Sequence, residues 1–159
     1  MPHIVIACTA NICRSPYVEA LLRRKLEPFD EHEWILSSAG TWAPVERSAA
    51  RYSIRLAKEI GLDLSGHTSR MISAEIMREA DLVLCMTSSH REALTIDFRD
   101  DKHKVFMLSE MIGRDFDVTD PYGGPLDGYI EMTTLVNQLL TEGLERIVQL
   151  SVRSTTTRL

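Results

Sequence analysis

The chain has 159 residues, of which 44% are hydrophobic and 26% charged, and its formal net charge at pH 7 is −5. Such a chain is long enough for one globular domain with its own core, and its acidic balance argues against a broad nucleic-acid-binding face. No apolar run approaches the roughly 20 residues of a membrane-spanning helix. No basic leader precedes the first apolar stretch, so we expect neither a membrane anchor nor a signal peptide.

Strands and helices are expected to alternate along the chain. Short apolar runs predict strands at residues 3–7, 34–38, 81–86 and 104–108, and helical spacing predicts helices at 15–26, 48–60, 73–80, 88–98 and 127–150. This alternation predicts a single-domain, Rossmann-like α/β fold, with a four-stranded parallel sheet and helices on both faces. We expect the domain to cover residues 1–150 and the polar tail, residues 151–159, to be frayed.

The segment between the first strand and the first helix, Cys8-Thr9-Ala10-Asn11-Ile12-Cys13-Arg14-Ser15, is a candidate anion site. It lies at the carboxyl end of a strand, where ligands of such folds bind. Loop N–H groups that lead into a helix converge on one point, and Arg14 adds a planar fork of donors that suits two phosphate oxygens. Helix N-termini and nearby cations favour the thiolate form of a cysteine. The loop therefore predicts that Cys8 attacks a bound phosphate and forms a phosphocysteine.

Hydrolysis also needs a group that protonates the leaving alcohol and later activates water, and one carboxyl group can do both. Asp120 is the candidate, in the turn-forming segment Asp120-Pro121-Tyr122-Gly123-Gly124. Taken alone, Cys8 could be an ordinary buried cysteine, and Asp120 an ordinary turn residue. The order of strand, loop, Ser-Pro helix start and downstream Asp-Pro favours the catalytic interpretation.

The three cysteines, Cys8, Cys13 and Cys85, are too few and odd in number for a disulfide framework. They fit a reducing compartment, so we expect a cytoplasmic protein. No Cys-x-x-Cys pair and no cluster of cysteine and histidine occurs, and we therefore expect no metal and no cofactor.

The residues that suggest this chemistry resemble a known family. The run from Cys8 to Pro16 is similar to the phosphate loop of the low-molecular-weight protein tyrosine phosphatases, Cys-x-Gly-Asn-x-Cys-Arg-Ser-Pro. The similarity continues in order through residues 37–41, 61–67, 80–86 and 120–122 and into the last helix, so it covers nearly the whole chain. It implies the phosphotyrosine protein phosphatase I fold, in a bacterial branch that also includes protein-arginine phosphatases.

The resemblance also implies a role for each matching residue. Cys8 resembles the nucleophile, Arg14 the phosphate-binding arginine and Asp120 the general acid. The phosphate-binding set is Thr9, Ala10, Asn11, Ile12, Cys13, Arg14 and Ser15. The residues that hold the loop and the thiolate in place are Asn11, Ser15, Ser38 and His67. Asn11 is expected at a strained backbone angle, and Cys13 is expected to trap oxidised Cys8 as a protective disulfide.

One position departs from the family pattern: Ala10 occupies the place of a glycine. Glycine suits close backbone approach and unusual angles, and the methyl group of alanine could crowd or tilt the loop. We expect activity to survive in weakened form. If the methyl group blocked the cradle, the chain would instead be a phosphate-binding module without turnover, a reading that no other feature of the sequence supports.

The sequence contains two conflicting indications of the substrate. Trp42 and Tyr122 resemble aromatic walls beside the phosphate slot, which admit an aryl phosphate, although either could instead pack in the core. In this family an isoleucine at the position of Ile12 goes with phosphotyrosine, and a threonine goes with phosphoarginine. Residues 104–108 and 120–127, however, resemble the branch that contains the arginine phosphatases. We favour phosphotyrosine because Ile12 would touch the ligand, with phosphoarginine as the alternative.

Arsenate reductase is a further alternative, because such enzymes share this fold and loop and relay oxidation through additional cysteines. Cys85 is the only candidate relay, and no cysteine follows it, which argues against this reading. The expected partners are a phosphorylated protein substrate and inorganic phosphate or sulfate in the cradle, without nucleic acid or membrane.

Overall fold

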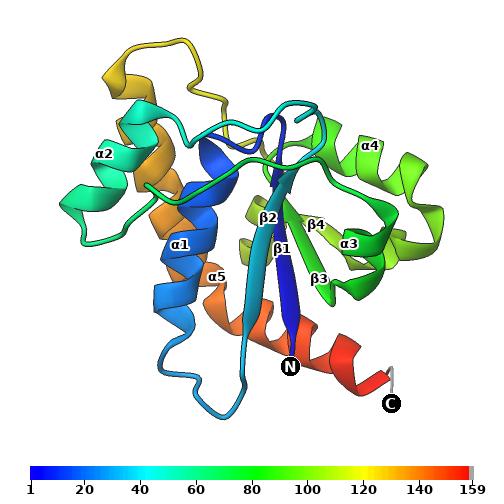
Figure 1. The fold of residues 1–159 in the computed structure, drawn as a ribbon. Coiled ribbons are helices and arrows are strands. Elements are labelled where there is room, and N and C mark those ends of the chain that lie inside the picture. The colour runs from blue at the N-terminus through cyan, green and yellow to red at the C-terminus, as the bar shows by residue number, and fades with distance from the viewer. Residues whose placement is uncertain (158–159) are drawn as a thin grey trace.

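A four-stranded parallel sheet in the order β2-β1-β3-β4 forms the centre of the protein, as a computed structural model that describes residues 1–157 shows (Figure 1). Its strands are β1 (His3–Cys8), β2 (Ile35–Gly40), β3 (Leu82–Cys85) and β4 (Val105–Met107). The helices are α1 (Arg14–Leu26), α2 (Arg51–Glu59), α3 (Ala74–Glu79), α4 (Ser88–Asp97) and α5 (Leu126–Thr157), with 3₁₀ turns at Arg99–Lys104 and Leu108–Ile112. The predicted α/β fold with four parallel strands is confirmed.

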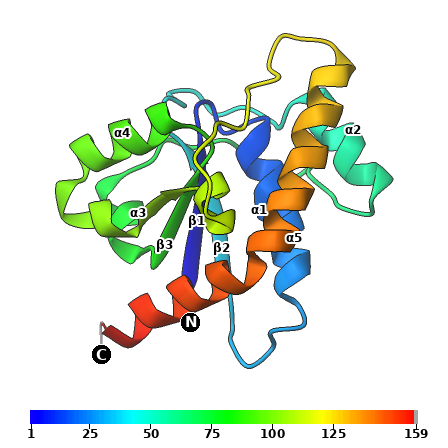
Figure 2. The same ribbon diagram turned by 180° about the vertical axis from the view of Figure 1, so that it is seen from behind.

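Helices cover both faces of the sheet, with α1 and α5 on one side and α3 and α4 on the other (Figures 1 and 2). Successive residues of β1 point to opposite faces. Ile4 and Ile6 therefore pack in the cluster beneath α1 and α5, while Val5 and Ala7 pack in the cluster beneath α3 and α4. All four side chains are fully buried, so the central strand is apolar throughout, as a sheet covered on both faces requires.

The C-terminal helix is longer than predicted. The expectation of a frayed tail from residue 151 is wrong for residues 151–157, which continue α5 as far as Thr157. Ser151 is buried, and its hydroxyl donates to the Ile147 carbonyl at 2.8 Å. Thr155 donates in the same way to the Ser151 carbonyl at 3.1 Å. Ser151 is packed in the interior, and tertiary packing supplies most of the stability of helices in proteins, so this polar segment can remain helical. The last two residues of the predicted tail lie outside the described part of the chain.

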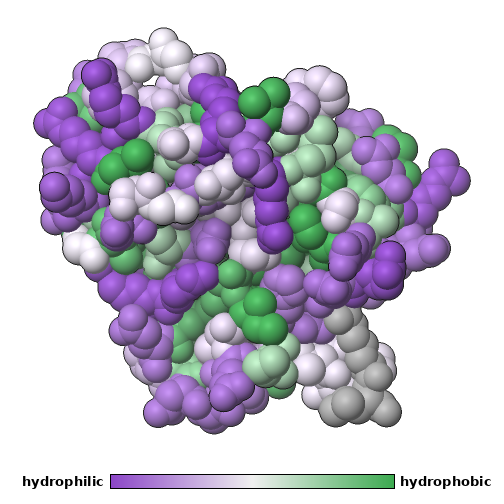
Figure 3. Space-filling model, in the orientation of Figure 1, coloured by the Kyte–Doolittle hydropathy of each residue, from purple (hydrophilic) through white to green (hydrophobic). Residues whose placement is uncertain are grey.

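Hydrophilic residues make up much of the face in Figure 3, with hydrophobic ones in separate patches. In the described part of the chain, no helix has both the length and the apolar character needed to cross a bilayer.

The carboxyl ends of β1 and β2 are joined by a close backbone contact. Cys8 lies opposite Gly40 in the register of the two strands. Beyond them, the N–H groups of Thr41 and Trp42 donate to the carbonyls of Cys8 and Thr9, each at 2.9 Å. A side chain at Gly40 would place its Cβ 2.4 Å from the Thr9 oxygen. The loop after β1 therefore rests directly on the backbone that follows β2.

Candidate active site

The β1–α1 loop and the segment around Asp120 enclose one small cavity at the carboxyl edge of the sheet. Its lining residues are Cys8, Thr9, Ala10, Ile12, Cys13, Arg14, Asp120 and Tyr122. Cys8 lies at the end of β1 and is only 2% exposed. Helix α1 begins at Arg14, so its first N–H groups belong to the same loop. The structure thus brings the candidate nucleophile, arginine and carboxylate together from segments more than 100 residues apart.

Asn11 holds the loop in shape. It is the only non-glycine residue in the described chain with a positive φ, 57°, which confirms the expected left-handed angle. Its side-chain nitrogen donates to Ser15 Oγ at 2.7 Å and to Ser38 Oγ at 2.9 Å. Its side-chain oxygen accepts from the Arg70 N–H at 3.0 Å, and its carbonyl accepts from His67 Nε2 at 2.7 Å. The buried amide is therefore fully satisfied, and it links the loop to β2 and to residues 67–70.

The same network orients a proton toward the candidate nucleophile. Ser15 Oγ lies 3.0 Å from Cys8 Sγ and accepts a hydrogen bond from Asn11. Because that acceptor site is occupied, the hydroxyl proton of Ser15 is free to point at the sulfur. The Ser15 hydroxyl is therefore placed to donate a hydrogen bond to the sulfur of Cys8.

Arg14 is buried, and both terminal nitrogens of its guanidinium are hydrogen-bonded. One terminal nitrogen donates to the Val118 carbonyl at 2.9 Å, and the other donates to Thr9 Oγ1 at 3.3 Å. Arg14 Nε is buried and has no hydrogen-bond partner within residues 1–157. A buried donor without a partner is costly, and an anionic oxygen in the adjoining cavity would satisfy it.

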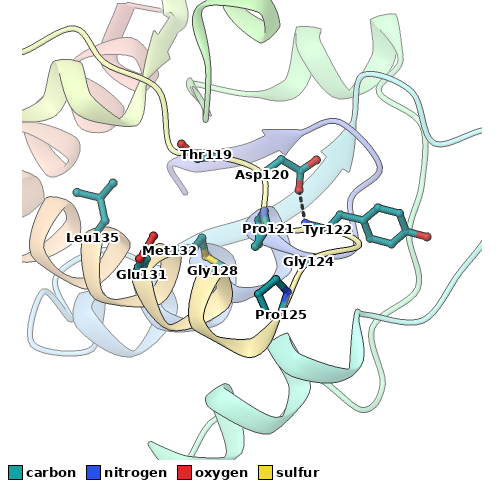
Figure 4. A pocket seen from close by; sticks show the side chains of 10 residues that line it. All are labelled: Thr119, Asp120, Pro121, Tyr122, Gly124, Pro125, Gly128, Glu131, Met132 and Leu135. Atoms are coloured by element: carbon teal, nitrogen blue, oxygen red, sulfur yellow. Dashed lines mark hydrogen bonds between the residues drawn. The ribbon is translucent and has the colours of Figure 1, made fainter.

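Asp120 lies in an irregular segment between the cradle and α5. Its Oδ2 is 3.5 Å from an Arg14 terminal nitrogen, and its Oδ1 accepts from the Tyr122 N–H at 3.1 Å. The side chain is 45% exposed, so water reaches it. Figure 4 shows this segment crossing above α5, where a second cavity lies between Pro121 and Met132. The carboxylate is held at its own turn and remains open to the cradle.

Of the two predicted aromatic walls, only Tyr122 lines the cradle. Tyr122 is 57% exposed and Trp42 is 66% exposed, so neither is packed in the core. Trp42 is not among the residues that line the cradle, although its backbone N–H bonds to the loop. Arg47 flanks Tyr122, with its guanidinium 5.5 Å from the ring centre and a terminal nitrogen 3.2 Å from the Tyr122 hydroxyl. The mouth of the cradle therefore carries an aromatic ring and a cation.

The two other cysteines are buried. Burial raises the pKa of the Cys13 thiol to about 11, and its sulfur lies 3.4 Å from the Tyr129 hydroxyl. Burial also raises the pKa of the Cys85 thiol to about 12. Cys85 belongs to the apolar cluster on the α3–α4 face of the sheet, whereas Cys8 belongs to the cluster on the opposite face. The sheet separates the two residues, so Cys85 cannot act as the relay that an arsenate reductase needs.

Ala10 causes no backbone strain in the loop. The left-handed angle lies at Asn11, and Ala10 has a negative φ that any residue adopts. Its methyl group packs against the core cluster beside Cys8. Ile12, also in the loop, is 2% exposed and contributes to the cavity wall. The expected crowding by alanine is therefore not found in the backbone of the cradle.

Sequence reasoning missed His90, which lies in the first turn of α4. Its Nε2 is 2.8 Å from Thr9 Oγ1, and the residue is 5% exposed. Burial and, to a smaller extent, the cation of Arg14 lower the pKa of His90 to about 4. No local pattern marks this residue, because its partner in the loop is 81 positions away. Elsewhere within residues 1–157, no group of three or more His, Cys, Asp and Glu side chains is placed to hold a metal ion.

Comparisons with known proteins agree with this geometry. A family model described as "Low molecular weight phosphotyrosine protein phosphatase" matches residues 3–152. A protein-arginine-phosphatase of Geobacillus stearothermophilus is 36% identical over 145 residues, which are 87% of this chain and 95% of that protein. The structure of the YwlE arginine phosphatase with a phosphorylated active-site serine superimposes with a TM-score of 0.86 at 32% identity, covering 96% of this chain and 99% of that one.

A low molecular weight protein tyrosine phosphatase from T. tengcongensis superimposes almost as well, with a TM-score of 0.85 at 33% identity, covering 92% of this chain and 99% of that one. Relatives named for tyrosine and for arginine thus match over nearly their whole length, in sequence and in fold. The chain belongs to the low molecular weight phosphotyrosine protein phosphatase family.

Proposed function

We propose that this chain removes phosphate from phosphotyrosine in proteins through a phosphocysteine on Cys8, with Asp120 as general acid and then general base. The observation that carries the proposal is the cavity whose lining brings together Cys8, Arg14 and Asp120, with Cys8 only 2% exposed.

In the first step the Cys8 thiolate attacks the phosphorus. A sulfur–phosphorus bond forms as the bond from phosphorus to the tyrosine oxygen breaks, and Asp120 gives its proton to that oxygen. Arg14 and the loop N–H groups stabilise the negative charge on the three remaining oxygens. The unpartnered Nε of Arg14 supports this role, because it leaves one donor free for the phosphoryl group.

In the second step water enters beside Asp120, which is partly exposed. The carboxylate takes a proton from the water, the oxygen bonds to phosphorus, and the sulfur–phosphorus bond breaks to release inorganic phosphate. The hydroxyl of Ser15, 3.0 Å from the sulfur, stabilises the thiolate that leaves. Both steps use only protein groups and water, and the proton taken from water returns Asp120 to the protonated form in which it began.

The mouth of the cradle favours an aryl phosphate. Cys8 lies at the bottom of a cavity walled by Ile12 and Tyr122, so a substrate needs a long side chain to reach the sulfur, and a flat ring packs well against an aromatic wall. Arg47 adds a positive charge over Tyr122. A phosphoarginine would bring its own guanidinium toward this cation, and like charges repel.

Phosphoarginine is the second candidate, because the protein-arginine-phosphatase of G. stearothermophilus is 36% identical to this chain. An exchange at Ile12, which contributes to the cradle wall, offers a direct test of the two substrates. We also propose a cytoplasmic location, since the mechanism needs Cys8 reduced and the three cysteines are all free. Inorganic phosphate is the product and therefore a ligand of the same cradle.

The experiment measures phosphate release, with EDTA present, from a phosphotyrosine peptide and from a phosphoarginine protein. We expect fast release from phosphotyrosine by the wild type and none by Cys8→Ser. The Ile12→Thr and Arg47→Gln variants should each raise activity on phosphoarginine relative to phosphotyrosine. A wild type that prefers phosphoarginine would reverse the substrate assignment. A wild type that binds phosphate and releases none from either substrate would refute the enzymatic proposal.

A further inference from the structure

His90 is a buried titratable side chain beside the cradle that the mechanism above does not use. It projects from the first turn of α4, at the end of the sheet that carries the β1–α1 loop (Figure 1). Its backbone N–H donates to Thr87 Oγ1 at 3.2 Å, and the adjacent Ser88 N–H donates to Asp117 Oδ1 at 2.9 Å. These two bonds fix the start of α4, so the imidazole occupies a defined position.

Thr9 Oγ1 connects this imidazole to the phosphate-binding arginine. The hydroxyl oxygen lies 2.8 Å from His90 Nε2 and 3.3 Å from a terminal nitrogen of Arg14. Arginine can only donate, so one lone pair of Thr9 is committed to Arg14. His90 Nε2 either donates to this hydroxyl or accepts from it, depending on the tautomer of the ring.

The other ring nitrogen decides the tautomer. Nδ1 of His90 is buried without a hydrogen-bond partner in the described chain. An orphaned buried N–H is rarer than an under-satisfied acceptor, so the proton belongs on Nε2 and is donated to Thr9. Thr9 then accepts from His90 and from Arg14, and its own proton is left for an acceptor in the cradle.

We propose that neutral His90 is a positioning residue of the phosphate site, which orients the Thr9 hydroxyl so that it holds one edge of the Arg14 guanidinium. Val118 holds a second nitrogen of Arg14 through its carbonyl. With both terminal nitrogens anchored, Nε and the remaining N–H groups face the phosphate at a fixed angle. This proposal rests on the phosphatase function proposed above, because it assigns His90 to the machinery of that reaction.

The charge of His90 matters as well as its hydrogen bond. The charged groups that act on the imidazole are Arg14, which opposes its protonation, and Asp117 and Asp120, which favour it. A protonated His90 would place a second cation beside Arg14 and would compete with it for Asp120. Burial and Arg14 together lower the pKa of His90 to about 4, so the ring is neutral near pH 7.

The test compares His90→Leu, which keeps an apolar body and removes both nitrogens, with His90→Gln, whose amide N–H reaches toward the position of Nε2. The control is His103→Leu, at an exposed histidine in the 3₁₀ turn Arg99–Lys104. We expect His90→Leu to lower kcat and to raise the inhibition constant of inorganic phosphate, each by about tenfold, because small displacements of catalytic groups are costly. His90→Gln should recover most of both, and the control should match the wild type.

Thr9→Val, which leaves His90 in place, should show the same defects, and the double variant with His90→Leu should be no worse than either single variant. Ring-nitrogen NMR of the wild type should show the Nε2–H tautomer of His90, and the ring should still be neutral about one pH unit below the ordinary histidine pKa of about 6.5. Kinetics of His90→Leu equal to those of the wild type, a His90→Gln variant no better than His90→Leu, or an additive double variant would each overturn the proposal.

Failure of this proposal is distinguishable from failure of the proposed function. An active wild type with an unaffected His90→Leu variant refutes only the positioning role. A wild type without phosphatase activity refutes the function, and phosphate binding together with the NMR tautomer then decides the role of His90. If His90→Leu does not fold, Thr9→Val and the NMR measurement supply the same decision.

Discussion

Replacing Gly40 with alanine should displace the catalytic loop, although it changes neither Cys8, Arg14 nor Asp120. The added Cβ would lie 2.4 Å from the Thr9 carbonyl oxygen, 2.8 Å from the Ala43 Cβ and 3.2 Å from the Ala10 carbonyl carbon. Two of these three atoms belong to the backbone of the phosphate loop. The Thr9 oxygen would have to retreat by at least about 0.6 Å to reach the 3.0 Å below which real Cβ contacts are essentially never seen.

That retreat is opposed by the hydrogen bonds that hold both backbones. The Thr9 oxygen accepts from the Trp42 N–H at 2.9 Å, and Gly40 itself bonds to Arg70 and Ile72 through its N–H and carbonyl. Overpacking of this kind costs about 1–3 kcal/mol of folding free energy. A displacement of catalytic groups by up to about 1 Å lowers the rate by as much as about 100-fold. We therefore expect Gly40→Ala to lower kcat/KM by up to about 100-fold, an activation cost of up to about 2.7 kcal/mol, in addition to its loss of stability.

The assay is kcat/KM on a phosphotyrosine peptide together with urea unfolding monitored by circular dichroism. Gly66→Ala is the matched control, because a Cβ at Gly66 meets no atom within 4 Å and its φ is not positive. We expect this control to change stability by no more than about 0.5 kcal/mol and to leave kcat/KM unchanged. A Gly40→Ala protein with wild-type kcat/KM, or one that merely tracks the control, would show that the contact between Gly40 and Thr9 does not position the loop.

Three further outcomes follow from the site. Asp120→Asn should lower kcat by about 100- to 10,000-fold while inorganic phosphate still binds. Steady-state kinetics measure kcat and product inhibition measures phosphate binding, and an unchanged kcat would exclude Asp120 as the acid. Iodoacetamide at pH 7 should label Cys8 and spare Cys13 and Cys85, whose pKa values of about 11 and about 12 keep them as thiols. Peptide mass spectrometry after alkylation measures the labelled fraction of each cysteine, and rapid labelling of Cys85 would contradict its burial. Because burial lowers the pKa of His90 to about 4 from about 6.5, the unfolded state binds the extra proton between these values. The free energy of unfolding should therefore fall as the pH drops from 6.5 toward 4, and urea titrations should show a shallower fall in His90→Gln, with identical slopes contradicting the assignment.

The order of elements and the loop could be predicted because their signals are local. Three of the four strands in the described chain are short, mainly apolar runs, and the loop carries its donors, sulfur and helix start within eight consecutive residues. Asp120 could be found because it lies in a turn with its own sequence signal. Its approach to Arg14, at 3.5 Å, is a tertiary contact that spacing alone could not predict.

The contacts that the sequence did not reveal join distant segments through common groups. Val118 uses a backbone carbonyl to hold Arg14 across 104 positions, and any residue has such a carbonyl. Thr9 and His90 meet across 81 positions through side chains that usually face solvent. The helical tail was missed for a different reason, since the packing of buried Ser151 outweighs the low helix propensity of serine and threonine.

Asn11 explains why alanine can replace the glycine of the family pattern at position 10. A tight loop that aims its N–H groups at one point needs a left-handed residue, and here Asn11 supplies it with a φ of 57°. The hydrogen bonds from the Asn11 amide to Ser15 and Ser38 offset the free-energy cost of the left-handed angle. Ser15 in turn contacts the sulfur of Cys8. Position 10 is then left with an ordinary angle that alanine adopts as readily as glycine. The residue that shapes the loop is thus the residue that orients the donor to the nucleophile, so a substitution at Ala10 is tolerable where one at Asn11 would disturb shape and chemistry together.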